Sequence, residues 1–167
     1  MVPLNILTLI AAPAPAPSVL VLKPDEEPVA EGKMRVVPIY IGTAEALALT
    51  AALEQTRLPR PTTHDLMLDA ISNLDATIDH VLINDSRGDI FYARLTILQH
   101  GRLIDLDARP SDAINLAIRQ GAGIFIEEKV LDKASFPYLF KHPIDEEAEV
   151  EDFRDFLDSI SPEDFTE

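Results

Sequence analysis

The sequence contains no cysteine, and that absence removes several kinds of chemistry at once. It excludes disulfide bonds, thiolate metal sites and a cysteine nucleophile. Chains of this kind are typical of reducing compartments, so we predict a cytoplasmic location. The sequence also lacks the run of about 18 apolar residues that a transmembrane helix requires. We therefore predict no membrane association.

Basic residues are scarce as well. The chain carries 14 Lys and Arg against 29 Asp and Glu, a net charge of −15. Residues 143–167 hold eleven of these acids and a single base, Arg154, so this tail carries −10 and the preceding 142 residues carry −5. Proteins that bind duplex nucleic acid need a basic surface to neutralise phosphates. The composition therefore disfavours a stable duplex-binding protein, and nucleic acid could be only a transient partner.

The first 17 residues, MVPLNILTLIAAPAPAP, have the outline of a signal peptide, because a short apolar run is followed by small residues. No basic residue precedes that run, however, and the first one in the chain is Lys23. We therefore predict a strand over residues 4–10 that ends in a Pro-Ala loop.

The hydrophobic pattern predicts a single α+β domain over residues 1–142, followed by the acidic tail, residues 143–167. A hairpin and a meander should form a mostly antiparallel sheet, packed with about three helices. The expected helices cover residues 43–56, 62–74 and 110–120, and the further strands cover residues 18–23, 33–42, 77–85, 89–99, 102–108 and 123–128.

Some residues make sharper predictions within these elements. Pro38 predicts that its strand lies at a sheet edge or contains a bulge, since proline cannot donate to a ladder. Thr43 should cap the first helix, and Thr62 or Thr63 the second. Helical spacing in the second helix predicts one buried face, formed by Leu66, Ala70, Ile71 and Leu74.

The acidic tail contains one organised segment, EEAEVEDFRDFLDSI. Its apolar residues have the spacing of an amphipathic helix with an aromatic stripe. Such a helix could bind a partner, but it more commonly docks on its own domain or on a sister subunit, which we favour. The stripe consists of Val150, Phe153, Phe156, Leu157 and Ile160.

The stretch ARPSDAINLAIRQG, residues 108–121, places polar residues at the start of an apolar helix. Pro110 suits the first helical position, with Arg109 at the N-cap, although Ser111 could also be the cap beside Asp112. Gly121 should end the helix in a left-handed conformation. Capping does not explain Arg109, whose guanidinium could pair with a carboxylate such as Asp65 or bind an anionic ligand.

The segment LDARPSDAINLAIRQGAGIFIEE closely resembles the signature of the bifunctional nuclease family. The segments VVPIYIGTAEALALTAALE, RPTTHDLMLDAI and IDHVLINDSRGDIFYARL resemble further parts of it, in the same order, so the resemblance covers roughly residues 2–140. The ending DFRDFLDSISPEDF is similar to that of actinobacterial members. The resemblance implies a compact α+β domain that associates with copies of itself. Since plant members carry RNase and DNase activity, it also implies a nuclease of low sequence specificity, acting on RNA and on single- or double-stranded DNA.

The family motifs point to five candidate site residues, which allow two chemical routes. In a metal route, Asp65 and Asp112 would hold Mg²⁺ or Mn²⁺. In a metal-free route, His64 would act as general acid or base, while Arg109 and Ser111 would bind the substrate. Either route requires His64 or Asp65 to lie near Arg109.

The same residues also allow a function without catalysis. Helix capping can account for Ser111 and Asp112, and also for His64 beside Asp65, because neighbouring helical residues point about 100° apart and would not both face one phosphate. Glu45, at another helix start, is a weaker candidate for a ligand. The alternative function is a homo-oligomeric module that binds a small anion or a protein partner.

Overall fold

A computed structural model describes residues 1–25, 33–56 and 58–139. The predicted tail helix and the boundary after residue 142 lie outside these residues. The strands are β1 (Val2–Ile10), β2 (Ser18–Pro24), β3 (Lys33–Ile41), β4 (Ala76–Arg87), β5 (Ile90–Gln99), β6 (Arg102–Ala108), β7 (Gly123–Ile126) and β8 (Phe136–Leu139). The helices are α1 (Thr43–Leu53), α2 (Thr63–Asn73), α3 (Pro110–Gln120) and α4 (Glu128–Ala134).

The strands form one eight-stranded sheet in the order β6-β5-β4-β7-β1-β2-β3-β8. Every neighbouring pair is antiparallel except β4 and β7, which run parallel. The predicted α+β class, the β2–β3 hairpin and the β4–β5–β6 meander are therefore confirmed. None of the helices in the described part of the chain is long and apolar enough to cross a membrane.

The structure contains one more helix and one more strand than predicted, both near the C-terminal end of the described residues. The described residues contain four helices rather than three, because α4 was missed, and β8 was missed with it. With seven residues, α4 is too short to show a helical period, and Pro137 obscures the four-residue strand β8. Short elements of this kind form because the surrounding chain packs on them rather than because of their own pattern.

The prediction for Pro38 is only partly correct. Strand β3 is not an edge strand, since β2 and β8 flank it. The ladder with β8 covers only residues 33–36, however, whereas Pro38 lies opposite Val21 in the half that pairs with β2 alone. At this position one side of β3 has no neighbouring strand among the described residues, which is a setting in which a sheet tolerates proline.

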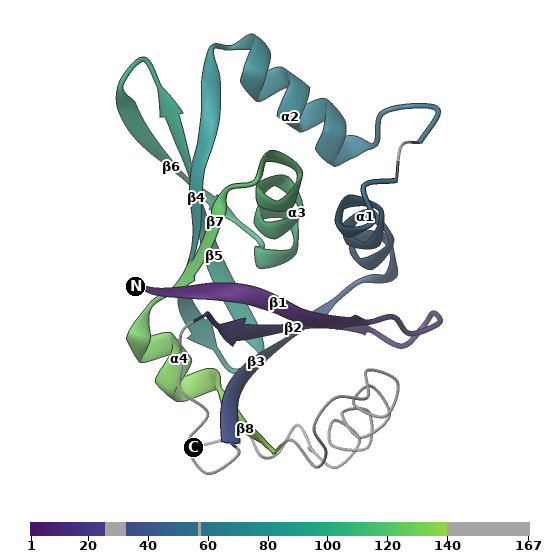
Figure 1. Cartoon of the computed structure of the whole chain (residues 1–167), viewed down its shortest axis with the longest axis vertical. Coiled ribbons are helices and arrows are strands. Elements are labelled where there is room, and N and C mark those ends of the chain that lie inside the picture. The colour runs from purple at the N-terminus through teal and green to yellow at the C-terminus, as the bar shows by residue number, and fades with distance from the viewer. Residues whose placement is uncertain (26–32, 57, 140–167) are drawn as a thin grey trace.

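Helix α3 lies at the centre of the molecule, where α1 and α2 pack against it and it packs against β4 and β5. Figure 1 shows these three helices together, with α4 at the opposite end of the molecule from α2. The buried residues of α3 include Ala113, Ile114, Leu116 and Ala117, and the alanines allow a close approach to its neighbours.

The predicted buried face of α2 is wrong. Ile71 is buried, but Leu66 and Leu74 are 65% and 64% exposed. The inward stripe instead passes through His64, Leu68 and Ile71. Helix α2 packs against α3 and β4, but the apolar face predicted from its sequence is not the face that is buried.

Candidate functional site

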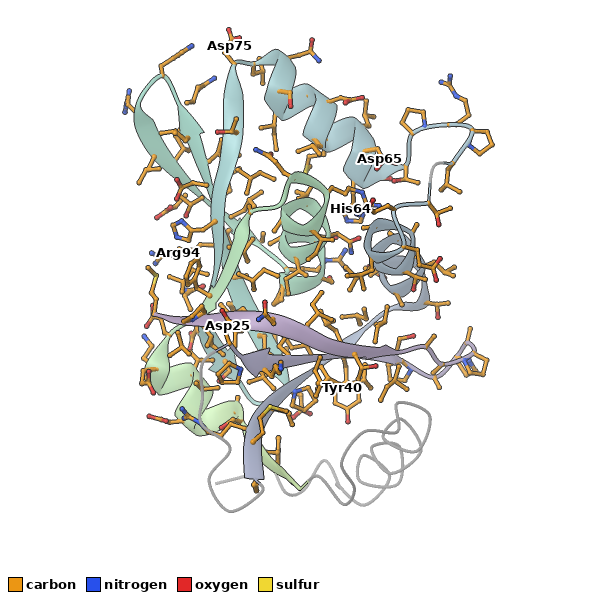
Figure 2. All side chains as sticks on the ribbon, in the orientation of Figure 1. Asp25, Tyr40, His64, Asp65, Asp75 and Arg94 are labelled. Carbon is orange, nitrogen blue, oxygen red and sulfur yellow. The ribbon has the colours of Figure 1, made fainter. Side chains whose placement is uncertain are left out.

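The first turns of three helices converge on one place. Glu45 lies in the first turn of α1 and Asp112 in that of α3, and Figure 2 shows His64 and Asp65 at the end of α2 nearest to these helices. Helix N-termini carry partial positive charge, so the arrangement combines three positive dipole ends with several acidic side chains.

The local sequence sets the ends of α3 as predicted. Arg109 is the N-cap residue, Pro110 occupies the first turn and Gly121 ends the helix with a left-handed φ of 76°. The two other caps differ slightly from expectation. Helix α1 begins after Gly42 rather than after Thr43 and ends at Leu53, whereas Thr62 caps α2 as predicted.

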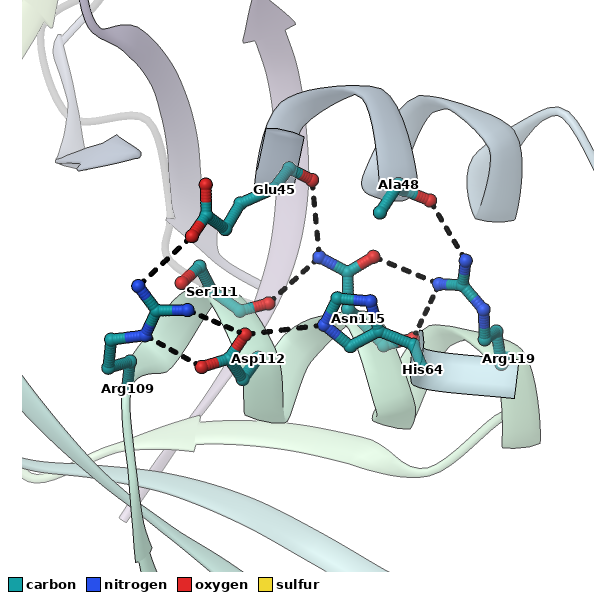
Figure 3. Close-up of polar contacts among 8 residues, drawn as sticks. All are labelled: Glu45, Ala48, His64, Arg109, Ser111, Asp112, Asn115 and Arg119. Atoms are coloured by element: carbon teal, nitrogen blue, oxygen red, sulfur yellow. Dashed lines mark hydrogen bonds and ion pairs between the residues drawn. The ribbon is translucent and has the colours of Figure 1, made fainter. Parts of the chain in front are cut away.

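Asp112 joins the starts of α2 and α3 (Figure 3). Its Oδ1 lies 3.3 Å from Nε2 of His64. Its two oxygens also accept hydrogen bonds from Arg109, from Nε at 2.7 Å and from Nη2 at 3.1 Å. The prediction that His64 or Asp65 lies near Arg109 is therefore confirmed for His64, with the carboxylate of Asp112 between the two side chains.

The charges in this group stabilise one another. Partial burial raises the pKa of the Asp112 carboxyl, but the hydrogen bonds from Arg109 and His64 outweigh it, so that the pKa is lowered overall. The hydrogen bond to Asp112 is also the main reason that the pKa of Arg109 is raised. Arg109 makes a second ion pair, with Oε1 of Glu45 at 3.0 Å from its Nη1. Asp112 is therefore ionised at neutral pH and accepts hydrogen bonds from both neighbours.

Asp65 lies in a different network, and its predicted pairing with Arg109 is wrong. Its Oδ2 accepts hydrogen bonds from the hydroxyl and backbone N–H of Thr62, at 2.7 and 2.8 Å. Its Oδ1 accepts one from Nε of Arg119 at 2.8 Å. The Thr62 hydroxyl, followed by Arg119, lowers the pKa of Asp65 to about 2. His64 and Asp65 thus face different partners, as the turn of a helix requires.

Two residues of α3, Asn115 and Arg119, were not identified from the sequence. The amide of Asn115 is fully buried and donates to the carbonyl of Ser111 at 2.9 Å, while its Oδ1 accepts from Arg119, also at 2.9 Å. Arg119 also donates to the carbonyl of Ala48 in α1, at 3.1 Å. An Asn four residues before an Arg in an otherwise apolar helix was the available signal, because this spacing puts both on one face.

The predicted metal ligands do not form a metal site as they are arranged. In residues 1–25, 33–56 and 58–139, no three His, Asp or Glu side chains are placed to hold a metal ion. Both oxygens of Asp65 and both oxygens of Asp112 contact other side chains. The donor set therefore does not fit Mg²⁺ or Mn²⁺, and we derive no step through a metal.

A hollow of about 470 Å³ lies beside Arg109, His64 and Asp112. The side chain of Arg109 is 65% exposed at this hollow, so a ligand can reach the guanidinium. Ser111 is 7% exposed and is not among the lining residues, so the structure does not bring this predicted substrate contact to the hollow. The lining consists of Ala44, Glu45, Leu47, Ala48, Ala51, Leu58, Thr62, Thr63, His64, Arg109 and Asp112.

Comparison with known proteins gives both a family and named relatives. The model of the bifunctional nuclease domain matches residues 28–138. An uncharacterized protein of Mycobacterium tuberculosis strain H37Rv is 42% identical over 138 residues, which cover 78% of this chain and 81% of that protein. Bifunctional nuclease 1 of Oryza sativa subsp. japonica is 30% identical over 103 residues, 60% of this chain but only 31% of the plant protein. Bifunctional nuclease 1 of Arabidopsis thaliana is 27% identical over 111 residues, 65% of this chain and 32% of that protein. The chain belongs to the bifunctional nuclease domain family.

Proposed function

We propose that this chain hydrolyses phosphodiester bonds in RNA and DNA, with low sequence specificity, at the hollow where α1, α2 and α3 begin. The observation that carries the proposal is the carboxylate of Asp112, which contacts an imidazole and a guanidinium at one solvent-reachable place. The names of the plant relatives support it, although the match covers less than a third of their length.

Each polar group has a distinct task in this chemistry. The ionised Asp112 can only accept from Nε2 of His64, so that nitrogen carries a proton and Nδ1 carries the lone pair. Nδ1 would take the proton from the nucleophile, which is a water molecule or, in RNA, the 2′-hydroxyl. As the nucleophile bonds to phosphorus, the bond to the leaving oxygen breaks, and that oxygen takes up a proton from the imidazolium or from water.

Arg109 and the helix ends would act on the phosphate itself. The guanidinium can bind the phosphate oxygens while negative charge builds up on them. The positive ends of the helices favour the same charge. Asp112 fixes the ring of His64 and stabilises the imidazolium that forms, in the way that carboxylates support catalytic histidines elsewhere.

The test is a cleavage assay on end-labelled RNA and single-stranded DNA, in EDTA and with added Mg²⁺ or Mn²⁺. His64→Asn should lower the cleavage rate at least about 100-fold without a large change in melting temperature. The matched control is His100→Asn, because His100 lies in the β5–β6 turn with a φ of 48°, a conformation that Asn tolerates. Equal cleavage by wild type and His64→Asn would assign the activity to another site or to a contaminant.

A second function, a non-catalytic homo-oligomeric module that binds a small anion or a protein partner, has its own support. Arg109 is already paired with both Asp112 and Glu45, so the group has little net positive charge to offer a polymer. Under this function no cleavage would occur with any metal. Light scattering would show oligomers, and isothermal titration with phosphate would show binding that Arg109→Met abolishes.

A further inference from the structure

One wall of the hollow is formed by apolar side chains that are not part of the hydrophobic core. Ala46 and Leu49 bury the core-facing side of α1. Five other residues of α1 line the hollow: Glu45 is acidic, and the four others are apolar and spaced so that they share a second face. The following loop adds Leu58. Leu47 and Leu58 are 67% and 51% exposed. We name this surface the apolar wall; it consists of Ala44, Leu47, Ala48, Ala51 and Leu58.

The polar part of the lining offers a small set of hydrogen-bond donors. A guanidinium has five N–H groups. In Arg109, Nε and Nη2 each donate to Asp112, and Nη1 contacts Glu45. Among the described residues this leaves one N–H on each terminal nitrogen, on a side chain that is 65% exposed. These two N–H groups suit the oxygens of a single phosphate.

The size and charge of the hollow limit what can fill it. A volume of about 470 Å³ lies within the range of pockets that hold one small organic molecule, and a single nucleotide is of that size. Glu45 and Asp112 flank the guanidinium, and the sequence contains no run of Lys or Arg to follow a longer phosphate backbone. The site can therefore neutralise about one phosphate, not many.

A base that is paired in a duplex could not lie against the apolar wall. In a duplex the faces of the bases are stacked and hidden, whereas an unpaired base can turn out and lie against protein. The side chains of the wall include no aromatic ring and no hydrogen-bonding group, so they can cover the face of any base without distinguishing its edges. This matches a site of low base specificity.

We infer that the hollow takes one unpaired nucleotide, with its base against Leu47 and Leu58 and a neighbouring phosphate at Arg109. The substrates are therefore single strands and strand ends rather than base-paired segments. The inference rests on the proposed function for its meaning in catalysis, but the binding step can be measured without hydrolysis.

The experiment measures fluorescence anisotropy of a labelled ten-nucleotide RNA, single-stranded or paired with its complement, on the full chain carrying His64→Asn. The single strand should bind at least about tenfold more tightly than the duplex. Leu47→Gln and Leu58→Gln, made in this background, should each weaken single-strand binding about fivefold, as expected for the loss of apolar contact. Leu66→Gln is the matched control, because Leu66 is 65% exposed but does not line the hollow.

The dependence on salt gives an independent measure of how many phosphates are bound. For single strands, the slope of log Kd against log salt concentration is about 0.7 per phosphate neutralised. We expect a slope near this value for the His64→Asn protein with an unchanged apolar wall, and a slope near zero when Arg109→Met is added to it. A slope above about 3 would mean that a much longer stretch of backbone is bound, and would overturn the inference.

The outcomes separate this inference from the proposed function. Equal affinity for strand and duplex, equal weakening by Leu66→Gln, or no binding of either probe overturns the inference, even if the protein cleaves RNA. Selective single-strand binding that depends on Leu47 and Leu58 supports it, even if no cleavage is found and the proposed function fails.

Discussion

The same three helices hold two Asp–Arg pairs of identical chemistry in opposite settings. In the pair of Asp65 and Arg119, the arginine side chain is 10% exposed, and its hydrogen bonds reach α1, α2 and α3. In the pair of Asp112 and Arg109, the arginine side chain is 65% exposed beside a hollow. The first arginine holds the helices together, and the second is available to a ligand. The role of an Asp–Arg pair therefore has to be judged from the burial of the arginine and from the number of its N–H groups that remain available to a ligand.

The largest difference between the pairs should appear in activity. Arg109→Met should lower the rate of RNA cleavage about 100- to 1000-fold, since it removes a preorganised cation from the phosphate. Its effect on the free energy of unfolding should stay below about 1 kcal/mol, because exposed ion pairs contribute little to stability. Cleavage rates and urea denaturation of the same preparations provide both numbers. If the variant unfolds as readily as Arg119→Met, the two pairs are not functionally distinct.

Stability should show the opposite pattern. Arg119→Met should lower the free energy of unfolding by about 3 kcal/mol, because the carbonyl of Ala48 and the side chain of Asn115 lose a donor in the interior. Urea denaturation at neutral pH measures this, with Arg109→Met as the control of equal size and charge change. A change below about 1 kcal/mol would show that water replaces the guanidinium and that the buried pair is not a helix clamp.

The sequence was sufficient to predict what depends on a single local signal. Pro110 and Gly121 each have a restricted backbone preference, so both ends of α3 were predicted correctly. The sequence also predicted that the start of α2 lies near Arg109, because both helix starts carry polar residues, but it left open whether His64 or Asp65 would be the neighbour. These predictions needed no knowledge of how the helices are rotated.

The remaining features of the site depend on how each helix is rotated about its axis, which the sequence pattern did not determine. One residue along a helix changes the direction of a side chain by about 100°, and this decides that His64 contacts Asp112 whereas Asp65 contacts Arg119. The same uncertainty made Leu66 an expected core residue, although it is exposed. The partners of an ion pair and the inward face of a thinly packed helix are set by tertiary packing, not by local periodicity.

The response to acid should distinguish the pairs more finely. The pKa of Asp65 is lowered from its ordinary 3.8 to about 2, chiefly by the Thr62 hydroxyl and by Arg119. Because the folded-state pKa lies below the unfolded one, the resulting stabilisation is present above about pH 4 and is lost as the pH falls from about 4 to about 2. The loss should be about 1 kcal/mol, since the carboxylate is 39% exposed and water screens the pair.

Asp65→Asn removes this dependence and can be followed by urea denaturation between about pH 5 and pH 2. The wild type should be the more stable protein at pH 5, and the difference should shrink toward pH 2. Asp69→Asn, at an exposed position of the same helix, is the control and should track the wild type. A constant difference across the whole range would mean that the charge of Asp65 is irrelevant and that only its shape matters.

The smallest effect should come from Glu45, which competes with any anion for Arg109. Its Oε1 lies 3.0 Å from Nη1 of Arg109, and its side chain is 19% exposed. Glu45→Gln keeps the shape but removes the negative charge, so a single-stranded oligonucleotide should bind about two- to fivefold more tightly, as expected for one weakly screened pair. Glu54→Gln changes the net charge equally at the other end of α1, away from the hollow. If both variants tighten binding alike, the gain comes from overall charge and Glu45 does not regulate the guanidinium. If only Glu45→Gln tightens binding, the exposed pair of Asp112 and Arg109 can be adjusted by a neighbouring charge, unlike the buried pair of Asp65 and Arg119.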